Sequence, residues 1–142
     1  MRAFRLQDQA EADLVGLGLR ILLLAPEGDE TLAQQLAGFG GRVERETELY
    51  AALAAVIDDP ADWDVLVMAC DSYGGIEAGR RAQAMLGVAA ERVSVILTSR
   101  DCGQQDFPED RHAPILLRAP ASAVSLRVGL EHALRGRLVW RL

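Results

Sequence analysis

The sequence predicts a single α/β domain in which helices cover both faces of a doubly wound, five-stranded parallel sheet. Short runs rich in Val, Leu and Ile recur along the 142 residues, and helical patterns separate them. Runs that are apolar throughout, rather than alternating, are typical of parallel strands buried on both faces. Strand and helix patterns that alternate along a chain favour a parallel sheet with helical crossovers.

Capping and breaking residues place the helices between these runs. Asp29 and Thr47 are expected to cap the first and second helices, and Gly87 is expected to end the third. Ser122 opens the last helix, which should stop before Gly136. The strands are expected at residues 19–25, 42–45, 64–69, 93–98 and 114–118, with the second strand near a sheet edge.

The domain is expected to cover residues 19–136, with an N-terminal extension at 1–18 and a C-terminal tail at 137–142. Neither a repeat nor a low-complexity linker interrupts it, and we expect no output module after the last helix. The length suits one domain with a substantial core.

Charge, cysteine spacing and the length of the apolar runs argue against several classes of protein. A net charge of −6 argues against nucleic acid or an anionic membrane as the partner, because both bind basic patches. Cys70 and Cys102 lack metal-ligand spacing, and the apolar runs are too short to cross a bilayer. We expect a cytoplasmic protein with reduced thiols, without a metal or a cofactor.

The stretch from Asp62 to Gly75 organises the chain. Its apolar run ends at Ala69 or Cys70 and leads into Asp71 and small polar residues. Open α/β sheets place their chemistry at the carboxyl ends of their strands. Here that place is occupied by a methyl group.

Three runs carry a resemblance to the receiver domain of response regulators. They are Ile21-Leu22-Leu23-Leu24, Asp64-Val65-Leu66-Val67-Met68 and Val95-Ile96-Leu97-Thr98-Ser99, and the resemblance spans roughly residues 19–136. It implies a flavodoxin-like sheet with strand order 2-1-3-4-5. The Gly74-Gly75 turn and the degenerate fourth helix also resemble the N-terminal receiver-like domain of bacterial flagellar master regulators.

The resemblance implies that most parts of a phosphorylation site are missing. A working receiver needs two acids after the first strand, an acceptor aspartate after the third, a hydroxyl after the fourth and a lysine after the fifth. Divalent cation and ammonium together neutralise the charge that builds on the phosphoryl oxygens. The corresponding positions are Ala25 and Pro26 with Glu27 nearby, then Ala69, Thr98 and Ala119, while Leu116 takes the aromatic switch position and Arg118 precedes Ala119.

These losses predict a pseudo-receiver: a non-enzymatic regulatory protein in bacterial signalling or transcription control that acts through protein contacts without phosphorylation. One alternative is a divergent single-domain response regulator phosphorylated at Asp71, with Glu27 as the only acidic partner. Another is a small-ligand sensor that uses the vacated crevice.

Other candidate residues have simpler interpretations. Cys70 could be a reactive thiol, but no neighbouring base lowers its pKa in the sequence, so space filling at a strand end is the better interpretation. His112 and His132 are expected on the surface. Arg80 and Arg81 could form a docking patch for an acidic partner, or simply a solvated helix face.

The C-terminal residues predict self-association. Val124, Leu126, Val128 and Leu130, together with the apolar residues at 138–142, offer more apolar surface than one helix face needs. We therefore expect a homodimer that forms through the last helix or the tail.

Overall fold

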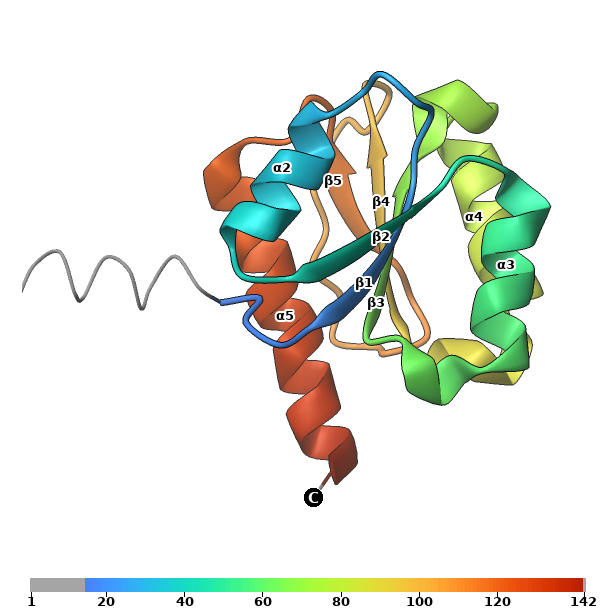
Figure 1. Cartoon of the computed structure of the whole chain (residues 1–142), viewed down its shortest axis with the longest axis vertical. Coiled ribbons are helices and arrows are strands. Elements are labelled where there is room, and N and C mark those ends of the chain that lie inside the picture. The colour runs from blue at the N-terminus through green and yellow to red at the C-terminus, as the bar shows by residue number, and fades with distance from the viewer. Residues whose placement is uncertain (1–14, 142) are drawn as a thin grey trace, which may run out of the picture.

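A computed structural model describes residues 15–141, and the side chains of residues 15–135. Five parallel strands form one sheet in the order β2-β1-β3-β4-β5, which confirms the predicted fold class (Figure 1). The strands are β1 (Arg20–Leu24), β2 (Arg42–Glu46), β3 (Val65–Ala69), β4 (Ser94–Ser99) and β5 (Ile115–Arg118). The helices are α2 (Thr31–Gly38), α3 (Leu49–Asp58), α4 (Ile76–Met85) and α5 (Ala123–Arg141), with the short turns η1 (Pro60–Asp62), η2 (Cys70–Tyr73) and η3 (Gly87–Glu91).

Two cores lie on opposite faces of the sheet because side chains alternate along each strand. Leu22 and Leu66 point to the face covered by α3 and α4, whereas Leu23 and Val67 point to the face covered by α2 and α5 (Figure 1). Strands β1, β3 and β4 are almost fully buried, as their continuous apolar runs predict. Strand β2 lies at the edge, and most of its side chains are charged and partly exposed.

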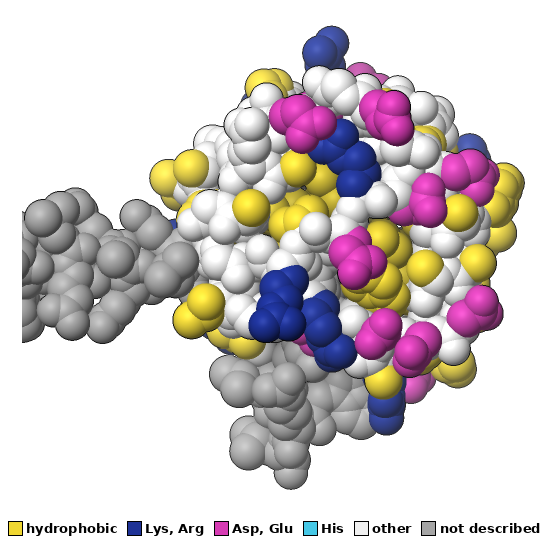
Figure 2. Space-filling view, in the orientation of Figure 1, with side chains coloured by type: hydrophobic (Ala, Val, Ile, Leu, Met, Phe, Trp, Pro, Cys, Tyr) yellow, Lys and Arg dark blue, Asp and Glu magenta, His cyan; other side chains and the backbone are white. Residues whose placement is uncertain are grey.

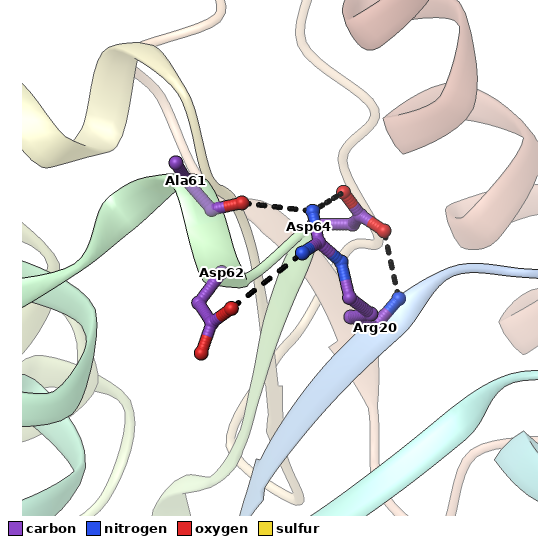
Figure 3. A network of polar contacts seen from close by, with 4 residues as sticks. All are labelled: Arg20, Ala61, Asp62 and Asp64. Atoms are coloured by element: carbon purple, nitrogen blue, oxygen red, sulfur yellow. Dashed lines mark hydrogen bonds and ion pairs between the residues drawn. The ribbon is translucent and has the colours of Figure 1, made fainter.

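A polar network joins the amino ends of β1 and β3 (Figure 3). The backbone amide of Arg20 donates to the Asp64 carboxylate at 2.7 Å, and the Arg20 guanidinium approaches the same carboxylate at 3.5 Å. The guanidinium also donates to the Ala61 carbonyl at 2.8 Å. Since Asp64 is only 3% exposed, this network compensates a buried charge and holds the two central strands in register.

Two of the predicted helix caps are wrong by one residue. Helix α2 has Glu30 at its N-cap, without a side-chain hydrogen bond, while Asp29 stays in the preceding loop. Helix α3 is capped by Glu48, whose carboxylate accepts the amides of Tyr50 and Ala51. Glu48 reaches two free amides of the first turn with one carboxylate, which the shorter Thr47 side chain cannot do.

Helix α5 continues past Gly136, where the sequence analysis ended it, and reaches Arg141. A single glycine costs a helix only about 1 kcal/mol relative to alanine, and Leu and Arg on either side favour the helix. The apolar stripe expected on this helix is divided between two faces. Leu126 and Leu130 are fully buried in the core, whereas Val124 and Val128 are exposed, because residues two apart do not share a helix face.

The expected N-terminal extension falls mainly on residues 1–14, which lie outside the described residues, as do the side chains of the expected tail at 137–142. Along the described chain, no helix has both the length and the apolar character needed to cross a membrane.

Candidate functional site

A pocket of about 240 Å³ opens at the carboxyl edge of the sheet. It lies between the first turn of α2, the end of β3 and the loop after β5, where the central strands of an open α/β sheet end. Three positions of the predicted site, Ala69, Thr98 and Ala119, line it together with Asp71. Its other lining residues are Asp29, Thr31, Leu32, Gln35, Ser72, Arg100, Pro120 and Ala121.

The strand ends bring a methyl group to the centre of this site. Ala69 is the last residue of β3, is half-buried and pairs with Thr98 on β4. Its side chain packs against the core under α2 and α5. A methyl group has no lone pair with which to attack phosphorus and offers no oxygen to a cation.

The residues after β1 do not supply the missing acids. Ala25 is fully buried, and its amide donates to the Glu46 carbonyl at 3.1 Å. Glu27 is exposed and is not among the residues that line the pocket. The structure therefore does not bring Glu27 into the pocket with Asp71, and Asp29 is the acid of this loop that faces it. In the described part of the chain, no group of three or more His, Cys, Asp or Glu side chains could hold a metal ion.

Asp71 links two loops at the edge of the pocket. One of its carboxylate oxygens accepts a hydrogen bond from the Ser99 hydroxyl at 2.6 Å, and the other accepts a hydrogen bond from the Arg100 backbone amide at 2.9 Å. The Ser99 hydroxyl oxygen in turn accepts the Asp101 amide at 3.1 Å. Both oxygens of Asp71 are thus engaged in joining η2 to the end of β4, which is a structural task.

Thr98 is buried beside this link. It is 4% exposed, and its hydroxyl lies 3.5 Å from the Met68 carbonyl on the neighbouring strand, at the long limit for a hydrogen bond. This contact points the hydroxyl at β3.

Arg45 holds the loop between β1 and α2, a role that sequence reasoning missed. Its guanidinium donates to the carbonyls of Pro26 at 3.3 Å and Asp29 at 2.8 Å, and forms an ion pair with Glu30 at 2.9 Å. Its side chain is only 19% exposed. A cation bound to this loop opposes a second, divalent cation there by charge repulsion. The only sequence signal for this role of Arg45 was the alternation of charges along β2.

Arg118 does not replace the missing lysine. Its guanidinium donates to the carbonyls of Cys102, at 3.1 Å, and Gly103, in the loop between β4 and β5. It is therefore turned away from the 240 Å³ pocket, which Arg100 lines instead. The aromatic switch position, Leu116, is 8% exposed and belongs to the core under α3 and α4.

The cysteine and histidine candidates have structural surroundings. Cys70 is fully buried, and burial, reinforced by the charge of Asp71, raises the pKa of its thiol to about 12. A thiol in this state is a poor nucleophile. His112 is exposed, as expected, whereas His132 is half-buried, contacts Phe107 edge-on at 6.2 Å and hydrogen bonds the Pro108 carbonyl.

Comparison with solved structures supports the receiver-like fold. A protein from Burkholderia pseudomallei that is described as pilus assembly-related superposes with a TM-score of 0.65 at 18% identity, over 87% of this chain and 92% of the other. A mutant form of the anti-anti-sigma factor PhyR from Bartonella quintana superposes with a TM-score of 0.55 at 17% identity. That match covers 99% of this chain and 57% of PhyR.

Sequence comparison adds no family. No protein-family model matches the chain, and no curated protein matches it. Identities of 18% and 17% establish the fold only, so function must be argued from the site.

Proposed function

We propose that this protein is a pseudo-receiver: a non-enzymatic, cytoplasmic regulatory module that acts through protein contacts and does not depend on phosphorylation. The observation that carries the proposal is Ala69 at the end of β3, where the resemblance requires an acceptor carboxylate. The nearest carboxylate in the sequence, Asp71, has both oxygens engaged by Ser99 and Arg100.

Charge around the pocket supports the same conclusion. Phosphoryl transfer to a carboxylate requires cations at the phosphoryl oxygens. The lysine position is Ala119, Arg118 is engaged with the loop between β4 and β5, and Arg45 is engaged with the loop after β1. What lines the pocket instead is a mixture of Asp29, Asp71 and Arg100.

The descriptions of the two structural neighbours, one pilus assembly-related and one an anti-anti-sigma factor, are compatible with a module whose task is contact with other proteins. The module is proposed to act in bacterial signalling or transcription control. Self-association through the last helix is part of the proposal, because Val124 is 70% exposed and Val128 is 36% exposed on α5.

A titration tests the proposal directly. Backbone amide NMR spectra of the protein should not change on addition of Mg²⁺ with beryllofluoride, a phosphoryl mimic. Asp71→Asn should respond in the same way as the natural chain. Saturable Mg²⁺ binding in the sub-millimolar range that Asp71→Asn abolishes would instead favour a divergent response regulator phosphorylated at Asp71. A pull-down from the native cell identifies the protein partner.

The pocket itself favours a second candidate function. Its volume of about 240 Å³ and its mixed lining of Thr98, Arg100 and Asp29 suit a small polar ligand. A small-ligand sensor would show saturable shifts confined to these residues when metabolite mixtures are added without Mg²⁺. Shifts of this kind would replace the protein-contact proposal for this edge of the domain.

A further inference from the structure

Helix α3 presents an apolar, uncharged face to solvent. Its inner face packs Ala52, Leu53 and Val56 on the sheet. On the outer face Tyr50 is 63% exposed and Ile57 is 45% exposed, and Ala54 between them is exposed as well. Residues at positions i, i+4 and i+7 form one ridge along a helix. A surface helix normally carries charged residues on its outer face, so this ridge has the pattern of a helix that packs on both sides.

Carboxylates stand at both ends of this ridge. Glu46 and Glu48 precede the helix, and Asp58 and Asp59 end it. The first pair suits the positive end of the helix dipole, but the second pair lies at the negative end, where carboxylates are unfavourable. The last turn of α3 has no basic residue. Figure 2 shows the result, with magenta groups above and below yellow side chains on the side of the molecule that α3 covers.

The apolar ridge and its acidic ends together indicate what kind of segment can bind to this face of α3. An apolar helix flanked by arginines would bury Tyr50 and Ile57 and would place cations beside Asp58 and Asp59. A surface that meets its own copy face to face would instead oppose carboxylates with carboxylates, which is costly.

This chain contains a segment of the required kind. Residues 135–142 read Arg-Gly-Arg-Leu-Val-Trp-Arg-Leu, with three arginines, four large apolar residues and no acid. The backbone of α5 continues as a helix to Arg141 and extends beyond the lower end of the sheet (Figure 1). Within one molecule α5 and α3 cover opposite faces of the sheet, so this segment is positioned for a second molecule and not for its own α3.

We infer that two copies of this chain associate reciprocally, with the basic end of α5 of each copy seated on the α3 ridge of the other. On a helix, positions 137, 140 and 141 (i, i+3 and i+4) share one face, so Trp140 supplies the apolar contact and Arg137 and Arg141 meet the carboxylates at the end of α3. The contact joins two different surfaces, so the assembly closes as a dimer when a two-fold axis between the copies forms both contacts at once. The inference rests on the proposed function in one respect, which is that self-association is part of it.

A charge-swap experiment tests the inference by analytical ultracentrifugation. The natural chain should form a concentration-dependent dimer. Asp58→Arg with Asp59→Arg, and separately Arg137→Glu with Arg141→Glu, should each weaken dimerisation by about 10-fold or more, because like charges then face each other. The two charge-reversed chains mixed in equal amounts should recover dimerisation, since one brings a natural α3 and the other a natural α5.

Glu27→Arg with Asp101→Arg is the matched control for the α3 reversal, because it changes the net charge by the same amount at two exposed sites that lie on neither α3 nor α5. This control should dimerise as the natural chain does, and circular dichroism confirms that each variant folds. Three results would each overturn the inference. They are a natural chain that stays monomeric at high concentration, a dimer that is insensitive to charge reversal at α3, and a mixture of the two charge-reversed chains that does not dimerise. None of these results bears on phosphorylation independence, which the beryllofluoride titration tests separately.

Discussion

The hydroxyl of Ser99 donates to the carboxylate of Asp71 at 2.6 Å, across 28 residues of sequence. The bond ties the turn after β3 to the end of β4, beside a methyl group at the tip of β3. The acid that sequence reasoning considered as a displaced phosphoacceptor is thus the acceptor in a structural link. Both carboxylate oxygens of Asp71 accept hydrogen bonds in this link, so neither could accept a phosphoryl group unless a hydrogen bond broke.

Asp71→Ala should therefore destabilise the fold. It removes two hydrogen bonds to a charged acceptor, for which a loss of about 1–3 kcal/mol in the free energy of unfolding is expected. Ser99→Ala should cost about 1 kcal/mol, and the double variant should cost less than the sum, because the two residues share one bond. Urea unfolding measures all three. Glu109→Ala, at an exposed carboxylate, is the control and should change stability by less than about 0.5 kcal/mol. Additive costs would show that the bond contributes nothing.

Arg45→Met should loosen the loop between β1 and α2. The substitution keeps the apolar stem but removes the donors to Pro26 and Asp29 and the ion pair with Glu30. We expect a loss of about 1–2 kcal/mol and faster amide hydrogen exchange over residues 26–32. The matched control is Arg42→Met on the same strand, where the side chain is exposed. Equal exchange rates in the two variants would contradict the role assigned to Arg45.

The core of this fold could be predicted from the sequence because burial leaves a local signal. Continuous apolar runs such as Ile21 to Leu24 are typical of strands covered on both faces, and helices between such strands imply parallel order. The methyl group at the carboxyl end of β3 could also be predicted, because Ala69 directly follows such a run.

The polar details of the site could not be predicted because they depend on contacts between distant residues. Whether Glu27 or Asp29 faces the pocket is decided by the path of the loop, which Arg45 holds from another strand. The Asp71–Ser99 bond likewise has no local pattern. The end of α5 was missed for a different reason: a glycine weakens a helix without stopping it.

Cys70 should react very slowly with thiol reagents in the folded protein. Burial first, and then the charge of Asp71, raise the pKa of its thiol from 9.0 to about 12, so at pH 8 the reactive thiolate is about 1,000-fold rarer than in the unfolded chain. The rate of reaction with Ellman's reagent in a Cys102→Ser background measures this, with the same variant in denaturing urea as the control. A folded rate within about tenfold of the unfolded rate would refute the assignment.

The same pKa shift predicts how stability depends on alkaline pH. Below pH 9 the thiol is protonated in both the folded and the unfolded chain. Between pH 9 and about 12 the unfolded chain loses this proton while the folded chain retains it, so the stabilising contribution is lost as pH rises. Cys70→Ala removes this contribution, and urea midpoints of the variant should therefore fall less steeply above pH 9 than those of the natural chain.

Ala69→Asp alone should not restore a phosphorylation switch. The new carboxylate would face a pocket that already contains Asp29 and Asp71, while the lysine position remains Ala119. Arg45 would still occupy the loop after β1. Without a divalent cation and an ammonium, the charge on a phosphoryl group at residue 69 stays uncompensated. Leu116 is buried and has no polar group with which to exchange between core and water, so Thr98 has no partner for a coupled movement.

The measurement is a set of backbone amide NMR spectra of the natural chain and of Ala69→Asp, each with and without Mg²⁺ and beryllofluoride. Within each protein the spectra should match, because no site binds the phosphoryl mimic. The positive control is a combined variant, because it supplies the charges that phosphoryl transfer requires. It carries Ala25→Asp, Pro26→Asp, Ala69→Asp and Ala119→Lys. Beryllofluoride shifts in Ala69→Asp that spread from residue 69 through Thr98 to β5 would mean that the fold retains a coupled switch after losing the groups that operate it.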